Sequence, residues 1–230
     1  MSKAARYRHE LKYEISYLEY IPLRQRLRAV MDKDSYADTE GQYKISSLYF
    51  DNYNDKALKE KVEGAPKREK FRIRYYNGDT SFMKLEKKMK INGLCMKHSC
   101  SITKDECERL LSGDYSWMLD SGRGLIQEFY TKIISQQLRP RTMVMYTREP
   151  YIYDAGNVRV TFDMNISTGL YATDFLKGDI EGIPAPTDGR IVLEIKYDDY
   201  MPELIRDIVQ VGVVRAEAFS KYAASRQYEL

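Results

Sequence analysis

The stretch KFRIRYY, residues 70–76, alternates cations with large apolar or aromatic side chains. In a β-strand successive side chains point to opposite faces, so Lys70, Arg72 and Arg74 share one face and the uncharged residues between them share the other. A soluble sheet usually buries its apolar face and leaves its charged side chains in water. The stretch therefore predicts a strand, and the row of cations raises the question of what it faces.

The same alternation recurs along the chain. Charged side chains stand two residues apart in RHELKY (8–13), FMKLEKKMK (82–90), VRVTFD (158–163) and IVLEIKY (191–197), and Lys97 and Arg148 add cations to two further segments. A solvated sheet face explains any one of these strands, but so many together favour charged faces that converge on a shared lumen. Inward cations repel one another and lose hydration, so they predict a polyanionic ligand.

Eight strands are predicted from these patterns, over 8–16, 43–51, 69–77, 80–90, 94–102, 141–149, 157–164 and 190–198. Asn-Gly pairs at 77–78 and 92–93 predict hairpin turns, which make 69–102 an antiparallel meander. Helices are predicted after the capping box of Thr103 and Glu106, and over 19–31, 55–62, 125–138, 202–210 and 215–228. The glycines and prolines of 167–189 predict a long, mobile loop.

The expected fold class is therefore α+β: an antiparallel β-barrel tunnel of about eight strands with surrounding helices, in a single domain over residues 1–230. The formal net charge is only +3, from 37 basic and 34 acidic residues, which argues against a nucleic-acid partner. Three cysteines match no zinc spacing and indicate a reducing compartment. With no apolar leader or membrane span in the sequence, we expect a cytoplasmic protein.

Three carboxylates lie among the aligned cations: Glu10, Glu86 and Glu194. Their hard oxygen atoms are suitable ligands for a divalent metal ion. A metal ion together with many arginines and lysines is the chemistry that binds a chain of phosphates.

The ordered segments ELKY, SSLYFDNYNDKALKEKV, KREKFRIRYY, LEKK, YTREPY, VRVTFD, VLEIKYDDYMP and SKY resemble the VTC (vacuolar transporter chaperone) domain. This is the polyphosphate polymerase family of the triphosphate tunnel metalloenzyme (CYTH-like) superfamily, and the resemblance spans about residues 6–223. It implies a tunnel enzyme, an ATP-polyphosphate phosphotransferase. Such an enzyme transfers the γ-phosphoryl group of ATP to a growing inorganic polyphosphate chain with the help of Mn²⁺ or Mg²⁺.

The same motifs imply roles for particular residues of this chain. The catalytic set would be Lys12, Arg72, Arg74 and Arg159, the metal ligand would be Glu194, and the substrate-binding set would be Lys88, Lys97, Tyr146, Arg148 and Lys221. Other branches of the superfamily begin with Glu-x-Glu-x-Lys, whereas here Arg8 takes the first position. That departure favours the polymerase branch and removes one acidic metal ligand.

Three alternatives stay open at the level of sequence. A triphosphatase would use water in place of the acceptor phosphate, and a polyphosphate-binding module would use the same tunnel without turnover. An RNA-binding sheet would use the interleaved Arg and Tyr of residues 70–76, although the low net charge and the aligned carboxylates argue against it. The regulatory SPX domain and the membrane helices of eukaryotic relatives are not expected here. Polyphosphate export would then need a separate membrane protein as partner, at the inner face of the membrane.

Overall fold

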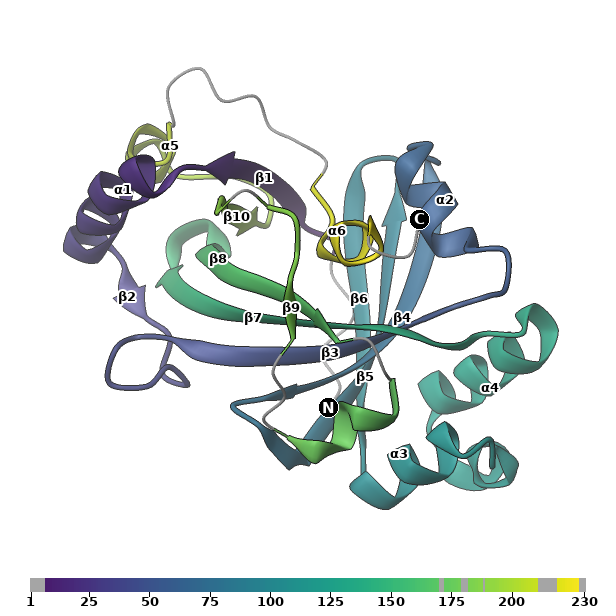
Figure 1. The fold of residues 1–230 in the computed structure, drawn as a ribbon. Helices are drawn as coiled ribbons and strands as arrows, with labels where there is room; N and C mark the ends of the chain where they lie inside the picture. Colours follow the sequence, from purple (N-terminus) through teal and green to yellow (C-terminus); the bar gives the residue numbers. More distant parts are fainter. Residues whose placement is uncertain (1–6, 170–171, 179–181, 188, 211–218, 228–230) are drawn as a thin grey trace.

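The computed structural model describes residues 7–169, 172–178, 182–187, 189–210 and 219–227. Its centre is a strongly curled antiparallel sheet in the order β1-β10-β8-β7-β3-β4-β5-β6, with short β2 paired to β7 and β9 paired to β8 (Figure 1). The strands are β1 (His9–Ile15), β2 (Asp32–Lys33), β3 (Tyr43–Asp51), β4 (Lys67–Tyr76), β5 (Asp79–Ile91), β6 (Leu94–Ile102), β7 (Arg139–Tyr153), β8 (Val158–Gly169), β9 (Ile183–Pro184) and β10 (Ile191–Tyr197).

Helices surround this sheet, as the sequence predicts. In Figure 1, α1 and α5 lie at one end of the molecule, and α3 and α4 lie at the other. Helix α6 lies between the strands around β10 and the strands around β6. The helices are α1 (Tyr17–Val30), α2 (Lys56–Val62), α3 (Lys104–Leu111), α4 (Gly124–Gln136), α5 (Glu203–Ile208) and α6 (Lys221–Ser225), with short 3₁₀ turns η1 (Ser116–Ser121), η2 (Ala155–Asn157) and η3 (Ala172–Lys177). None of the described helices is both long and apolar enough to span a membrane.

The two edges of the sheet meet at one point. Arg8, just before β1, forms an isolated antiparallel bridge with Cys95 of β6, and the two backbone N–H···O distances are 3.0 and 3.2 Å. The expected antiparallel tunnel is therefore confirmed. It is a curled sheet whose edges touch at this bridge, rather than a barrel with a continuous ladder of hydrogen bonds.

The predicted hairpins form at both Asn-Gly pairs. Asn77 and Asn92 each have a positive φ, 51° and 48°, and the glycines that follow them do too. Two consecutive positive φ values give the type I′ turn that suits the twist of paired strands. The capping box also forms, because the Glu106 N–H donates to Thr103 Oγ1 at 3.2 Å and the Thr103 N–H donates to Glu106 Oε2 at 2.9 Å.

The uncharged strand faces pack against helices, which leaves the charged faces on the inside of the curl. On β4, Phe71 is stacked on Phe129 of α4 with ring centroids 4.9 Å apart. Tyr75 contacts Phe175 of η3 at the same centroid distance, and both residues are fully buried. A second core joins α1 and α5 to the outward faces of β8 and β10.

Two predictions need correction. Strand β7 runs through Pro150 to Tyr153, and β8 continues to Gly169, so both strands are longer than predicted. The described parts of 167–189 are not a featureless loop, since they contain the end of β8, η3 and β9. The glycines and prolines of this segment favoured a loop. Strand β9 was not predicted because its pairing with β8 depends on a tertiary contact. Within the C-terminal prediction of 215–228, residues 215–218 and 228 lie outside the described residues.

Candidate active site

A cationic cavity, called here the inner cavity, lies within the curled sheet and holds about 430 Å³ of empty space. Eight of its lining residues are lysines or arginines and one is a carboxylate, and the start of α6 contributes to its wall. The lining consists of Lys12, Tyr49, Lys70, Arg72, Arg74, Lys88, Tyr146, Arg148, Glu194, Lys196, Ser220 and Lys221.

A second space, called here the outer cavity, adjoins the first and holds about 680 Å³. The two cavities share Lys12, Lys70, Lys88 and Ser220. The outer cavity adds further cations from α2, β4 and β5, namely Lys61, Arg68 and Lys90, together with the carboxylates Glu10 and Glu69. A continuous cation-lined path therefore runs from the inner cavity toward α2.

Glu194 of β10 is the only carboxylate among the described residues that line the inner cavity, and it is 4% exposed. Its Oε1 is 2.6 Å from Lys196 Nζ, and its Oε2 accepts a hydrogen bond from Arg148 Nη2 at 3.1 Å. Burial alone would raise the pKa of Glu194, but the charges of Lys196, Lys12 and Arg148 outweigh it and hold that pKa well below the usual range. The carboxylate is ionised at neutral pH.

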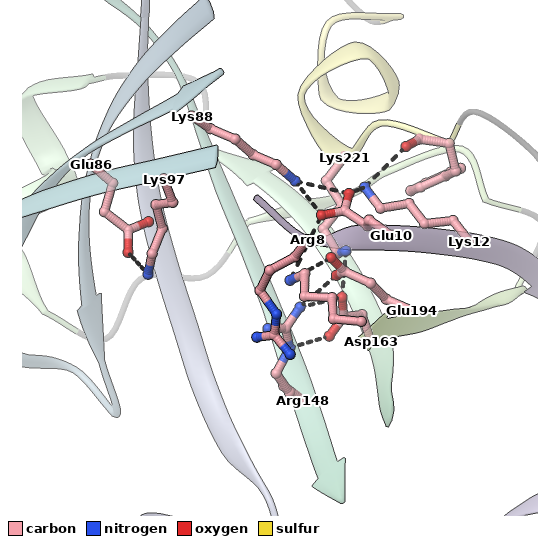
Figure 2. Close-up of polar contacts among 12 residues, drawn as sticks. Arg8, Glu10, Lys12, Glu86, Lys88, Lys97, Arg148, Asp163, Glu194 and Lys221 are labelled. Atoms are coloured by element: carbon pink, nitrogen blue, oxygen red, sulfur yellow. Dashed lines mark hydrogen bonds and ion pairs between the residues drawn. The ribbon is translucent and has the colours of Figure 1, made fainter. Parts of the chain in front are cut away.

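Asp163 of β8 forms ion pairs with two of the lining cations, although it does not itself line the cavity (Figure 2). Arg148 of β7 donates to both Asp163 oxygens, with Nε–Oδ1 at 2.6 Å and Nη2–Oδ2 at 2.7 Å, and Lys221 of α6 pairs with the same carboxylate. A bidentate pair fixes the plane of a guanidinium group. Asp163 therefore orients Arg148 and also ties α6 to the sheet.

Glu10 of β1 plays a similar role at the border of the two cavities. Lys88 of β5 donates to its Oε1 and Oε2 at 2.8 and 2.7 Å, and Lys12 Nζ lies 3.1 Å from Oε1. Burial would raise the pKa of Glu10, but Lys12 and Lys88 lower it below the usual range. The pair also joins two strands that are not hydrogen-bonded neighbours, β1 at one edge of the sheet and β5 next to β6 at the other edge.

The two arginines of the opening motif have different partners. Arg72 Nε donates to Glu86 Oε2 at 2.8 Å, and its Nη1 donates to the Tyr49 hydroxyl at 2.8 Å. Arg74 has neutral hydrogen-bond partners: its Nε donates to Ser47 Oγ and its Nη2 to the Tyr146 hydroxyl, each at 3.0 Å. Arg74 is thus oriented by its neighbours, and no carboxylate in the described part of the chain forms an ion pair with it.

Eight of the ten predicted site residues lie around the inner cavity; Lys97 and Arg159 do not. The Lys97 side chain is 54% exposed and its Nζ is 3.0 Å from Glu86 Oε1, a pair that stands apart from the other labelled residues in Figure 2. Arg159 pairs with Asp34 and donates to the Tyr43 hydroxyl at 2.8 Å, with its side chain 33% exposed. Glu86, one of the three carboxylates proposed from the sequence as metal ligands, also lies outside the lining. It accepts hydrogen bonds from Arg72 and Lys97.

Four lining residues were absent from the predicted site: Tyr49, Lys70, Lys196 and Ser220. The two lysines carried a signal, because each stands two residues from a predicted site residue on the same strand face. The sequence did not indicate a role for Tyr49, because its side chain carries no formal charge. In the structure its hydroxyl accepts a hydrogen bond from Arg72. Burial would raise the pKa of Tyr49, but Arg72 and Lys70 together lower it to about 7.

The donor set fits a divalent metal ion that shares its ligands with phosphate. The described residues contain no cluster of three or more His, Cys, Asp or Glu residues. Glu194 and Glu10 do supply hard carboxylate oxygens beside the cavity, and Mg²⁺ is commonly held by one or two carboxylates with substrate phosphates completing its shell. The position of Arg8 supplies no carboxylate to a metal ion. The Arg8 Nε instead lies 2.9 Å from Asp198 Oδ1, near the point where the two edges of the sheet meet.

Solved structures with the same fold come from several organisms. A putative adenylyl cyclase from Hippeastrum, described as having a dominant triphosphatase activity, matches with a TM-score of 0.55 at 14% identity, over 97% of both chains. A putative adenylate cyclase from Bacillus halodurans matches with a TM-score of 0.53 at 16% identity, over 90% of this chain and 88% of that one. A Pyrococcus horikoshii protein gives 0.50 at 15%, over 94% and 97%. No curated protein sequence matches the chain.

The curled antiparallel sheet with its cationic lumen defines a triphosphate tunnel protein, the class of fold that these neighbours share. Within that class, the family model of the VTC domain matches residues 7–229. The chain therefore belongs to the VTC domain family. Family and fold together place it among polyphosphate-related tunnel enzymes.

Proposed function

We propose that this protein is a polyphosphate polymerase, which transfers the γ-phosphoryl group of ATP to a growing inorganic polyphosphate chain inside the tunnel. The observation that carries the proposal is the composition of the inner cavity, where eight cations surround one carboxylate. Four carboxylates, Glu10, Glu86, Asp163 and Glu194, pair with six of these cations, so positive charge remains in excess. Buried like charges repel one another and lose hydration, and the lining therefore favours a ligand with several negative charges. A chain of phosphates meets that requirement along its whole length.

The lining residues supply positioning and charge neutralisation. Arg72 and Arg74 stand two residues apart on β4 and would contact successive phosphates, while Arg148 of β7 and Lys221 of α6 would bind from other parts of the lining. The terminal phosphate of the acceptor is already ionised, so in-line transfer needs no general base. Fixed cations aimed at the transferring group stabilise the charge that develops in the transition state.

Glu194, with Glu10 as its neighbour, would hold the divalent ion, Mn²⁺ or Mg²⁺. Such an ion neutralises charge on the phosphate oxygens as the phosphoryl group is transferred. The low pKa of Glu194 keeps its carboxylate available at neutral pH. Metal entry would require Lys196, now 2.6 Å from Glu194 Oε1, to turn toward the phosphate ligand.

Arg159 and Lys97 would act from the periphery. Lys97 neutralises Glu86, which also holds Arg72, so the effect of Lys97 on the reaction would pass through Arg72. Arg159 lies beside Tyr43, whose register partner is Arg148, and would contact substrate at the edge of the cavity.

A triphosphatase is the second candidate, favoured by the activity described for the Hippeastrum protein of the same fold. In that reaction water replaces the acceptor phosphate, and the same lining would bind the triphosphate. The outer cavity favours the polymerase, because its added cations continue the cation-lined wall beyond the inner cavity.

Product analysis distinguishes the candidates. The purified protein is incubated with ATP and Mn²⁺, and the products are resolved by gel electrophoresis and phosphorus NMR. A polymerase releases ADP and accumulates phosphate chains, with orthophosphate as a minor product. ADP and orthophosphate in equal amounts would establish a triphosphatase, and polyphosphate binding without turnover would establish a binding module.

A further inference from the structure

Lys70 occupies a special place in the site, at the junction of the inner and outer cavities. It is the lining cation that begins the motif KFRIRYY, and it also lines both spaces. Lys12 and Lys88 also line both spaces, so a phosphate chain that extends from one cavity into the other would pass close to all three cations. The set of predicted site residues did not include Lys70, although it shares the strand face of Arg72 and Arg74.

The partners of Lys70 differ from those of most other cations in the lining. Among the residues that the structure describes, Lys12, Arg72, Lys88, Arg148, Lys196 and Lys221 each pair with a carboxylate. In the same described set, Lys70 Nζ has no carboxylate partner and lies instead over two aromatic rings, 5.1 Å from the centroid of Tyr49 and 5.9 Å from that of Tyr222. These two rings are themselves stacked, with centroids 5.1 Å apart.

We infer that Lys70 is a phosphate-binding residue that binds the ligand chain where the two cavities join and takes up a proton when the chain binds. This inference rests on the proposed function, because it assumes that the tunnel binds a phosphate chain. The ligand class is an inorganic polyphosphate or the triphosphate of a nucleotide. The binding step adds one proton from solvent to the neutral amine and breaks no covalent bond.

The surroundings explain why much of the Lys70 amine is neutral near pH 7 before the ligand arrives. Burial lowers the pKa of Lys70 to about 7, with further lowering from Lys88, Lys12 and Arg72, and opposed by Tyr49. The charged or titratable groups around Lys70 come from every element packed against it. They are Tyr49 and Asp51 of β3, Arg68, Glu69 and Arg72 of β4, Lys88 and Lys90 of β5, Cys95 of β6, Glu10 and Lys12 of β1, Lys56, Glu60 and Lys61 of α2, and Tyr222 of α6. Each of the four carboxylates in that set has another partner: Glu10 pairs with Lys12 and Lys88, Glu69 with Lys87 and Lys132, Glu60 with Lys56, and Asp51 accepts a hydrogen bond from the Tyr222 hydroxyl.

A bound phosphate would reverse this balance. A phosphate oxygen beside Lys70 adds negative charge where cations now predominate, which raises the pKa of the amine toward or above its ordinary value. By linkage, binding is then coupled to proton uptake and weakens as the pH rises above about 7. The stacked rings limit the positions of the side chain, so the ammonium group stays at the junction in both states.

Calorimetry with metal-free tripolyphosphate tests the inference. Binding is measured at pH 7.5 in two buffers of different ionisation enthalpy, for the wild type and for Lys70→Arg, which keeps its charge at every pH. Protonation of the ligand and of other residues is common to both proteins and cancels in the difference. The wild type should take up about 0.75 more protons per bound tripolyphosphate than Lys70→Arg, the fraction of neutral amine expected for a pKa of about 7.

Three further proteins complete the test. Lys70→Met should weaken tripolyphosphate binding about 10- to 100-fold, the loss expected for a hydrogen bond to a charged group. Lys87→Arg is a matched control on the outer face of β5, where Lys87 pairs with Glu69 and Glu128, and it should match the wild type. Tyr49→Phe should keep the extra proton uptake. If Tyr49→Phe loses the extra proton uptake, the Tyr49 phenol titrates in place of Lys70, and the inference is overturned.

The outcomes separate this inference from the proposed function. Equal proton uptake by the wild type and Lys70→Arg would overturn the role of Lys70, even for a protein that synthesises phosphate chains. Failure of the wild type to bind tripolyphosphate would overturn both. Binding with the extra proton uptake, in a protein that only hydrolyses ATP, would support the inference and overturn the polymerase.

Discussion

The two faces of strand β4 lie in opposite environments, although their residues alternate along one chain segment. On the outward face, Phe71 and Tyr75 are buried among aromatic rings of α4 and η3. On the inward face, Arg72 and Arg74 border a cavity lined by other cations. One strand can thus contribute to stability and to ligand binding independently, because alternation places the two sets of side chains on opposite faces of the sheet.

That comparison predicts that inward substitutions change turnover and outward substitutions change the free energy of unfolding. Glu194→Gln, on the inward face of β10, is expected to give the largest effect. It keeps the size of the side chain but removes the charge proposed to hold the metal ion, so turnover should fall by about a thousandfold or more. Initial rates across a manganese titration measure this. Undiminished rates would exclude Glu194 as the ligand, and Glu128→Gln, a carboxylate on the outside that pairs with Lys87, is the matched control.

On the outward face, Phe71→Ala should act through stability alone. The side chain is 2% exposed and stacked on Phe129, so its loss leaves a cavity that costs about 3–5 kcal/mol in the free energy of unfolding. Urea denaturation measures the loss. At a temperature where the variant remains folded, its turnover should equal that of the wild type, and a large loss of rate there would break the comparison between the two faces.

Arg74→Ala tests the inward face of β4 itself. The guanidinium is oriented by Ser47 and Tyr146, and its removal should lower turnover about a hundredfold, because one phosphate loses a fixed charged donor. The free energy of unfolding should change little, since repulsion from the neighbouring cations is relieved as hydrogen bonds are lost. Arg123→Ala removes an arginine that pairs with Glu106 outside the tunnel and should leave turnover unchanged. A comparable loss of rate in both variants would contradict the assignment.

The smallest expected effect is a gain in stability on the inward face. The pKa of Lys70 is about 7 in the fold, below its ordinary value of 10.5, so the folded state disfavours the charged amine. The free energy of unfolding of the unliganded protein should therefore rise as the pH increases from about 7 toward 10.5. Lys70→Met should raise Tm by about 2–4 °C at pH 7, equivalent to about 1 kcal/mol, with the advantage gone near pH 10.5. A lower Tm at pH 7 would contradict this prediction.

Local patterns predicted most of the sheet because its strands follow a period of two residues. Strands β3 and β6 begin and end where the alternation does, and the Asn-Gly turns fix the register of the meander between β4 and β6. The extension of β7 was missed because Pro150 normally marks the end of a strand, whereas here it is paired opposite Thr161.

For the candidate site, the sequence predicted which strand face each side chain occupies, but not which side chains contact one another. The period of two residues places Lys12, Arg74 and Glu194 on inward faces, and the structure brings them to one cavity. Which cation has a carboxylate partner depends on pairs that cross the lumen, such as Lys88 with Glu10, and no local pattern encodes them. For the same reason the sequence did not distinguish Lys70, or separate Lys97 and Arg159 from the cavity lining.

A crystal structure of the protein with a bound short-chain polyphosphate and Mn²⁺ tests the central claim most directly. The account predicts phosphates in the inner cavity within hydrogen-bond distance of Arg72, Arg74 and Arg148, and an anomalous manganese signal beside Glu194. It also predicts that the chain continues past Lys70 into the outer cavity. Phosphates bound only on the outer surface of the sheet, with the inner cavity containing water alone, would contradict it.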